Sequence, residues 1–189
     1  EVRQLTEKLL AGGADIDALN RARGQLSALK CGKLGQAMRP AKIINVVISD
    51  VPLGDVSTVG SGPTIPSASA PYPAQTHVAA DNQTARCAVV AAAADLGLRL
   101  IDRGPALWGD AARAGELYGA EPRGEADGYV MGGETTVVVK GSGEGGRNQE
   151  LILGSVGHWN GGGLLLSFGT DGVDGRSPAA GALMDDSAA

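Results

Sequence analysis

The sequence predicts an α/β fold built on a parallel sheet, and three observations support this prediction. Ile43–Ile48 is an unbroken apolar run rich in β-branched residues, which is typical of a strand buried on both faces of such a sheet. A predicted helix at 84–96, a short strand at 98–101 and a helix at 110–117 then alternate, as in βαβ units. Residues 164–168 form another apolar run, predicted to be a second central strand.

A domain boundary is predicted near residue 125, where polar and charged residues precede a predicted strand at 129–131. Residues 1–125 are expected to form the C-terminal part of a Rossmann-like domain that is incomplete at its N-terminus. Residues 126–189 are expected to form a second, smaller α/β domain.

Apolar residues at helical spacing predict two more helices in the first part, at 2–10 and 16–29. Residues 67–81 are predicted to be a short, irregular segment.

The composition indicates a globular chain and limits its partners. Of the 189 residues, 43% are hydrophobic and 20% are charged, but only 3% are aromatic, so the core must consist of small aliphatic side chains. A net charge of −5 and the absence of a basic run argue against nucleic acid as a partner. No apolar run reaches the roughly 18 residues of a membrane span. The two cysteines are widely spaced, which argues against a zinc site or a disulfide and fits a cytoplasmic protein.

The glycine-rich segment 131–150 is the strongest functional signal. A predicted strand at 135–140 leads through several glycines to a predicted helix, and a helix N-terminus presents unpaired N–H groups to an anion. The spacing fits both GxGxxG and a P-loop, but Arg147 and Asn148 stand where a P-loop has Lys and Ser or Thr. A glycine-rich hairpin connection explains the spacing equally well.

Two acidic residues follow the predicted central strands. Asp50 comes directly after the strand at 43–48, and Asp171 comes shortly after the strand at 164–168. Because ligands bind beyond the carboxyl ends of parallel strands, these carboxylates are candidates for holding Mg²⁺ on a triphosphate. The alternative is that each one caps a turn or a helix.

Several literal strings, in order along the chain, resemble the glycerate 2-kinase family. These are ATP-dependent kinases, some of which carry the name hydroxypyruvate reductase. The matching strings are SDVP (49–52), SGPT (61–64), GGETT (132–136), KGSGEGGRNQE (140–150) and GTDGVDG (169–175). By this resemblance, residues 126–189 are a MOFRL-type C-terminal domain. The chain departs from the family at Cys31, where a glycine is usual, so an altered backbone is expected there.

The resemblance implies transfer of the γ-phosphoryl group of ATP to the 2-hydroxyl of D-glycerate, with Mg²⁺. It implies catalytic roles for Arg147 and Asp171 and a metal ligand at Asp50. It also implies a set of substrate-binding residues: Arg23, Lys30 and Ser61. The residues implied to bind the nucleotide are Gly132, Gly133, Glu134, Thr135, Gly145, Gly146 and Asn148.

The family's lysine-bearing segment, its serine- and glycine-rich loop and its final glycine- and asparagine-rich segment have no counterpart in this sequence. We therefore expect an internal fragment with little or no activity by itself. Two other classes stay open: an NAD(P)-dependent hydroxypyruvate reductase and a non-catalytic remnant. The expected partners are ATP and a small hydroxy acid, and a homo-oligomer stays open.

Overall fold

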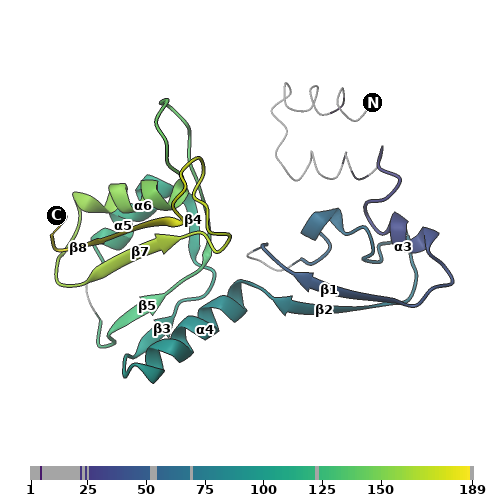
Figure 1. Ribbon diagram of the computed structural model, residues 1–189, viewed down its shortest axis with the longest axis horizontal. Coiled ribbons are helices and arrows are strands. Elements are labelled where there is room, and N and C mark those ends of the chain that lie inside the picture. Colours follow the sequence, from purple (N-terminus) through teal and green to yellow (C-terminus); the bar gives the residue numbers. More distant parts are fainter. Residues whose placement is uncertain are drawn as a thin grey trace. The chain divides into compact units, whose positions relative to one another are not determined.

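The computed structural model describes residues 5, 22, 24, 26–51, 55–68, 70–121 and 124–187 of the chain. The chain divides into two compact units, Glu1–Thr84 and Ala85–Ala189. Both mix helices with parallel strand pairs, which confirms the α/β class (Figure 1). The boundary near residue 125 stays a prediction. Within the described residues, no helix is both long enough and apolar enough to cross a membrane.

The first unit is organised around one parallel strand pair, β1 (Ile43–Ile48) and β2 (Ala74–Ala80), with the short helices α3 (Lys33–Ala37) and η1 (Val59–Ser61). The buried Asn45 side chain ties β1 to its surroundings, because its amide donates to Thr64 O at 3.0 Å and to Thr76 Oγ1 at 3.2 Å. Most residues of the predicted helices at 2–10 and 16–29 lie outside the described residues. Of those that are described, residues 5, 22, 24 and 26 are helical, whereas residues 27–29 are not, so the predicted end of the second helix at residue 29 is wrong.

The prediction that β1 is a central strand buried on both faces is wrong. Ile43 is buried, whereas Ile44, Val46 and Ile48 are 56%, 72% and 75% exposed. Successive side chains of a strand point to opposite faces, and among the described residues only β2 pairs with β1. One face is therefore covered and the other is not.

The prediction that residues 67–81 are irregular is also wrong, because β2 lies there. Its sequence, AQTHVAA, combines alanine with polar residues and has little intrinsic preference for a strand. Pairing with β1 along its length decides its conformation.

Cys31 adopts the backbone conformation that a glycine would adopt, with φ of 56°. Its N–H donates to Ser61 O at 2.9 Å, and the following Gly32 donates to Gly62 O at 2.8 Å. Ser61 also has a positive φ, of 64°. Two left-handed turns thus hold segment 30–32 against segment 61–62.

The second unit begins with two interrupted parallel strands side by side. β3 (Leu100–Asp102) continues into β4 (Leu107–Asp110), and β5 (Gly128–Val130) continues into β6 (Gly133–Thr136). β3 pairs with β5 and β4 with β6, and backbone bonds such as Leu107 N to Gly132 O (3.0 Å) bridge the interruption. A Cβ at Gly133 would lie 1.9 Å from Leu107 O, so only glycine fits at this interruption.

Helices α4 (Asn82–Asp95) and α5 (Ala111–Gly119) confirm two predicted helices within a few residues. Asp110 begins α5 by accepting a hydrogen bond from Arg113 N at 3.0 Å. Gly97 ends α4 with φ of 78°, and the bonds Gly97 N to Ala94 O and Leu98 N to Ala93 O form a Schellman motif.

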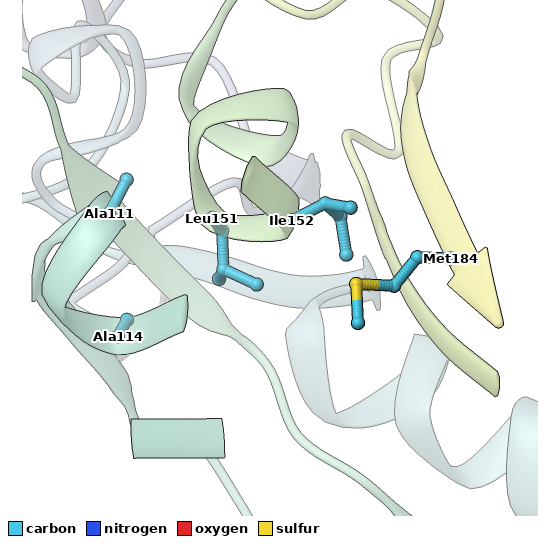
Figure 2. Packing of buried hydrophobic residues seen from close by; sticks show 5 residues of the cluster. All are labelled: Ala111, Ala114, Leu151, Ile152 and Met184. Carbon is cyan, nitrogen blue, oxygen red and sulfur yellow. The ribbon is translucent and has the colours of Figure 1, made fainter. Parts of the chain in front are cut away.

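The core of the second unit lies where α5 and α6 (Arg147–Val156) pack together against β8 (Gly181–Asp185). Its buried residues are Ala111, Ala114, Leu151, Ile152 and Met184. Figure 2 shows the alanines on α5, Leu151 and Ile152 on α6, and Met184 reaching from β8 toward Ile152. The buried side chains are aliphatic except for Met184, and the partly buried Tyr118 and Trp159 pack against them. The two helix backbones come very close, because a Cβ at Gly115 would lie 2.0 Å from Leu151 O.

The strand at 164–168 is present as β7 (Leu164–Phe168), but its predicted parallel, central position is wrong. It pairs antiparallel with β8, which the sequence did not predict, and Leu164, Leu166 and Phe168 are 61%, 51% and 51% exposed. Helix α6 covers one face of this pair (Figure 1). The alternation of side chains leaves the other face open.

Gly115→Ala is expected to destabilise the second unit. A Cβ at Gly115 would lie 2.0 Å from Leu151 O, so α5 and α6 would have to move apart. Overpacking of this kind costs about 1–3 kcal/mol or more, which exceeds the gain of about 1 kcal/mol in helix propensity. A lower thermal melting temperature is the expected result. Gly157→Ala is the matched control, because nothing lies within 4 Å of its Cβ position and its φ is −74°. An unchanged melting temperature for Gly115→Ala would contradict this packing.

Asp102 is expected to make stability depend on pH. Its carboxylate accepts from Gly104 N at 2.8 Å and from the buried Arg86 Nε at 2.7 Å, and these bonds lower the pKa of Asp102. A lowered folded-state pKa stabilises the fold above the unfolded-state value of about 3.9, and that contribution is lost as the pH falls further. The free energy of unfolding lost in Asp102→Asn should therefore be largest near pH 7 and shrink toward pH 3 in urea titrations. A loss that does not vary with pH would contradict this.

Candidate functional site

The candidate site is the start of α6 in the second unit, where the glycine-rich segment becomes helical. β6 ends at Thr136 and α6 begins at Arg147, so ten residues separate strand from helix. The predicted strand at 135–140 is thus shorter than expected, and Val138 and Val139 are 73% and 82% exposed. Gly146 occupies the N-cap position in an extended conformation and has no side chain with which to cap the helix. The cap must come from elsewhere in the sequence.

Asp174, in the loop between β7 and β8, supplies that cap. Its Oδ1 accepts from Asn148 N at 3.0 Å, and its Oδ2 accepts from Gln149 N at 2.8 Å. The residue is only 2% exposed. A negative charge at a helix N-terminus is favoured by the helix dipole as well as by these bonds. Two of the N–H groups that the sequence suggested for an anion therefore already bind a carboxylate of the protein.

Gly146 and Gly175 allow the segment before α6 to contact the β7–β8 loop closely. A Cβ at Gly146 would lie 2.4 Å from Asp174 Oδ1, and a Cβ at Gly175 would lie 2.4 Å from Gly145 O. Arg176 N also donates to Gly145 O at 3.1 Å. At these positions the close approach of two backbones is enough to require glycine. A further role of Gly145 and Gly146 in binding a nucleotide stays a prediction.

Asn148 is held by two side chains. Its Nδ2 donates to Asp174 Oδ1 at 3.0 Å, and its Oδ1 accepts from Ser167 Oγ of β7 at 2.7 Å. Ser167 and Asp174 are both buried. The Asn148 amide thus links the start of α6 to β7 and to the β7–β8 loop.

Arg147 points away from this buried cluster. Its guanidinium pairs with the Glu134 carboxylate of β6 and lies 3.4 Å from Thr135 O, and its side chain is 49% exposed. The Glu134 side chain is 52% exposed. The structure therefore brings together three predicted site residues, Arg147, Glu134 and Thr135, with a permanent positive charge open to solvent.

The other predicted residues lie in separate places. Gly132 lies in the interruption between β5 and β6, and Gly133 is the first residue of β6. Asp171 is exposed in the β7–β8 loop, where it accepts from Val173 N at 3.3 Å. Asp50 is exposed just after β1 in the first unit. Arg23 lies outside the described residues.

Lys30 and Ser61 are brought close by the first unit. The hydrogen bond from Cys31 N to Ser61 O places the segment that carries Lys30 against the turn that carries Ser61. The roles of both residues in binding the substrate stay predictions.

No group of three or more His, Cys, Asp or Glu side chains suited to a metal occurs in the described part of the chain. Magnesium bound with a nucleotide does not need such a group, because phosphate oxygens and water fill most of its coordination sites. The role of Asp50 as a metal ligand stays a prediction.

Comparison with known proteins gives the family. Residues 1–99 match the family described as "Domain of unknown function (DUF4147)", and residues 128–189 match the MOFRL family. The chain belongs to the glycerate 2-kinase family. Its relatives include proteins named as a D-glycerate 2-kinase and as a glycerate kinase.

Individual relatives agree with this assignment. The chain is 31% identical to a D-glycerate 2-kinase from Thermotoga maritima, over 100% of the chain and 55% of the relative. It is 33% identical to an Agrobacterium vitis protein named as a hydroxypyruvate reductase, over 96% of the chain and 59% of the relative. A crystal structure of glycerate kinase from Thermotoga maritima matches it with a TM-score of 0.88 and 29% identity, over 99% of the chain and 55% of the structure. The chain thus spans a little over half the length of these relatives.

Asp174 is the residue that the sequence analysis missed. It stands three positions after Asp171 in the string GTDGVDG, and Gly175 follows it directly. The signal in the sequence is an aspartate followed directly by a glycine. The fold is needed to show that this carboxylate is buried and that it caps α6.

The ion pair of Arg147 and Glu134 is expected to contribute little to stability. Exposed pairs contribute about 0–1 kcal/mol, so Arg147→Ala and Glu134→Ala should each lower the free energy of unfolding by less than about 1 kcal/mol. Urea denaturation of the 189-residue chain measures this. A loss of several kcal/mol would show that Arg147 has mainly a structural role.

Proposed function

We propose that the protein containing this chain transfers the γ-phosphoryl group of ATP, bound with Mg²⁺, to the 2-hydroxyl of D-glycerate. Membership of the glycerate 2-kinase family supports the reaction class. The observation that carries the proposal within this chain is the Arg147 guanidinium, which is half exposed on the first residue of a helix whose start is fixed by buried bonds.

The chemistry requires such a group. In this reaction the substrate hydroxyl oxygen forms a bond to the γ-phosphorus while the bond to the β–γ bridging oxygen breaks, and ADP leaves as the hydroxyl proton is lost. Negative charge spreads over the phosphoryl oxygens in the transition state, and positioning and electrostatics do most of the catalysis. Arg147 supplies a delocalised charge with a forked set of donors that matches phosphate or carboxylate oxygens.

We assign the remaining roles by family membership and position. In the first unit Asp50, exposed after β1, is the candidate ligand of nucleotide-bound Mg²⁺. In the second unit Asp171, exposed after β7, is the second candidate for contact with reacting atoms. Lys30, beside Ser61, and Arg23 are the candidates for holding the glycerate carboxylate. Glu134 keeps the Arg147 guanidinium oriented along β6.

A nicotinamide-dependent reductase, suggested by the name of the Agrobacterium vitis relative, is less well supported. A dinucleotide fingerprint joins a strand to a helix by a tight turn and uses the helix N–H groups to bind the pyrophosphate. Here ten residues separate β6 from α6, and the N–H groups of Asn148 and Gln149 bind Asp174.

The direct test measures ADP release with ATP and D-glycerate, in parallel with NAD(P)H oxidation in the presence of hydroxypyruvate. The assay uses the natural protein that contains these residues, and the 189-residue chain is assayed beside it. Glycerate-dependent ADP release by the natural protein is the expected result, with little or none from the chain alone. Hydroxypyruvate-dependent oxidation without ADP release would support the reductase, and neither activity would support a non-catalytic remnant.

Arg147 variants of the natural protein should lose activity in a defined order. Arg147→Lys keeps the charge but loses the forked donors, and Arg147→Ala loses both, so kcat/KM should fall more in the second. Loss of a charge-assisted contact of this kind costs about 2–4 kcal/mol, which is roughly 30- to 1,000-fold in rate. Steady-state kinetics and thermal melts of both variants provide the test. Near-normal kcat/KM in Arg147→Ala would exclude this role.

A further inference from the structure

We propose that Asp174 is a positioning residue: its carboxylate takes the place of a bound anion at the N-terminus of α6 and thereby fixes the Arg147 side chain. The catalytic part of this inference rests on the proposed function, whereas the structural part does not. Asp174 lies in the string GTDGVDG, but the resemblance implies no role for it.

The contacts of Asp174 fix α6 at two points. Each carboxylate oxygen accepts from a different backbone N–H of the first turn, Oδ1 from Asn148 and Oδ2 from Gln149. Two bonds to neighbouring residues prevent the helix end from rotating about its axis. Arg147 immediately precedes this pair, so its Cα cannot move independently of them.

The loop that carries Asp174 is itself held in place. Asp174 N donates to Ala179 O at 2.8 Å, and Asp174 O accepts from Ser177 N at 3.1 Å. The same loop donates from Arg176 N to Gly145 O, one residue before the helix cap. These backbone bonds fix the loop, so the main chain from which the Asp174 side chain extends is held in place.

The negative charge of the Asp174 carboxylate also changes how the start of α6 interacts with other anions. With the N–H groups of Asn148 and Gln149 bonded to a buried carboxylate, the start of α6 repels a second anion where an open helix end would attract one. The exposed positive group nearest in sequence is the Arg147 guanidinium, on the Glu134 side. A phosphate or carboxylate of the substrate is thus directed to the Arg147 side chain and away from the helix backbone.

The structural part is tested by nuclear magnetic resonance on the 189-residue chain. Asp174→Ala vacates a space bordered by two N–H groups, so added formate should shift the amide signals of Asn148 and Gln149 and raise the melting temperature. The wild type and the control Asp171→Asn should show neither effect. The Arg147 side-chain Nε signal should move in Asp174→Ala and return toward its wild-type position with formate.

Two results would overturn this part of the proposal. One is a folded Asp174→Ala whose Asn148 and Gln149 amides do not respond to formate. The other is an Arg147 signal that is the same in wild type and variant. If Asp174→Ala is unfolded without formate, folding on addition of formate supports the proposal, and failure to fold with it contradicts the proposal.

The catalytic part is tested by kinetics of the near-isosteric Asp174→Asn in the natural protein, below its melting temperature. Misplacement of Arg147 should lower kcat about 10- to 100-fold, with a smaller change in KM for ATP. In an Arg147→Ala background the same change should have little further effect, whereas a merely structural role predicts independent, additive losses. Additive losses or an unchanged kcat would overturn the proposal. A wild type without glycerate kinase activity would instead refute the proposed function, and the formate experiment would still decide the role of Asp174.

Discussion

The bonds between the Asp174 carboxylate and the first turn of α6 are the interaction on which the candidate site depends. They satisfy N–H groups that no side chain of the glycine-rich segment is able to satisfy, because the N-cap residue is Gly146. They also join α6 to the β7–β8 loop and, through Asn148 and Ser167, to β7. Three parts of the second unit that are distant in sequence therefore hold one another in place. Arg147 is the group that this arrangement presents to solvent.

The same unit relies on close backbone contact in its core. Where larger side chains would separate α5 from α6, Gly115 and Gly154 allow the helices to approach until a Cβ would meet a carbonyl group of the other helix. Few aromatic residues are available to fill a wider gap. Small residues and short distances thus provide the dispersion contacts that bulky side chains provide in other proteins.

The glycines of the signature strings have structural reasons that are independent of any ligand. Gly133 lies against β4, Gly146 against Asp174, and Gly175 against the backbone of Gly145. A motif rich in glycine is usually interpreted as a place where a ligand approaches the main chain, but here the main chain itself makes the approach. For the proposed kinase, the side chains at the end of the glycine-rich segment are therefore stronger candidates for ligand binding than its glycines. Arg147 and Glu134 are the two that the fold brings into contact.

Several conclusions were available from the sequence alone. Apolar runs, the alternation of predicted elements and the glycine-rich segment indicated the α/β class, helices α4, α5 and α6, and strands β1, β3, β5 and β7, and literal strings indicated the family. These features depend on neighbours in the chain, so the sequence records them directly. The Arg147 segment was found in the same way, by its local string.

Only the tertiary structure decided how those elements are paired and covered. β2, β4 and β8 have weak local signals and form because a partner strand is present, and the exposed faces of β1 and β7 depend on what packs beside them. Asp171 and Asp174 both look suitable in the sequence, but the loop geometry buries Asp174 against α6 and leaves Asp171 exposed. Side-chain contacts between residues 25 or more positions apart leave no periodic trace in a sequence, because the chain path that creates them is set by the whole fold.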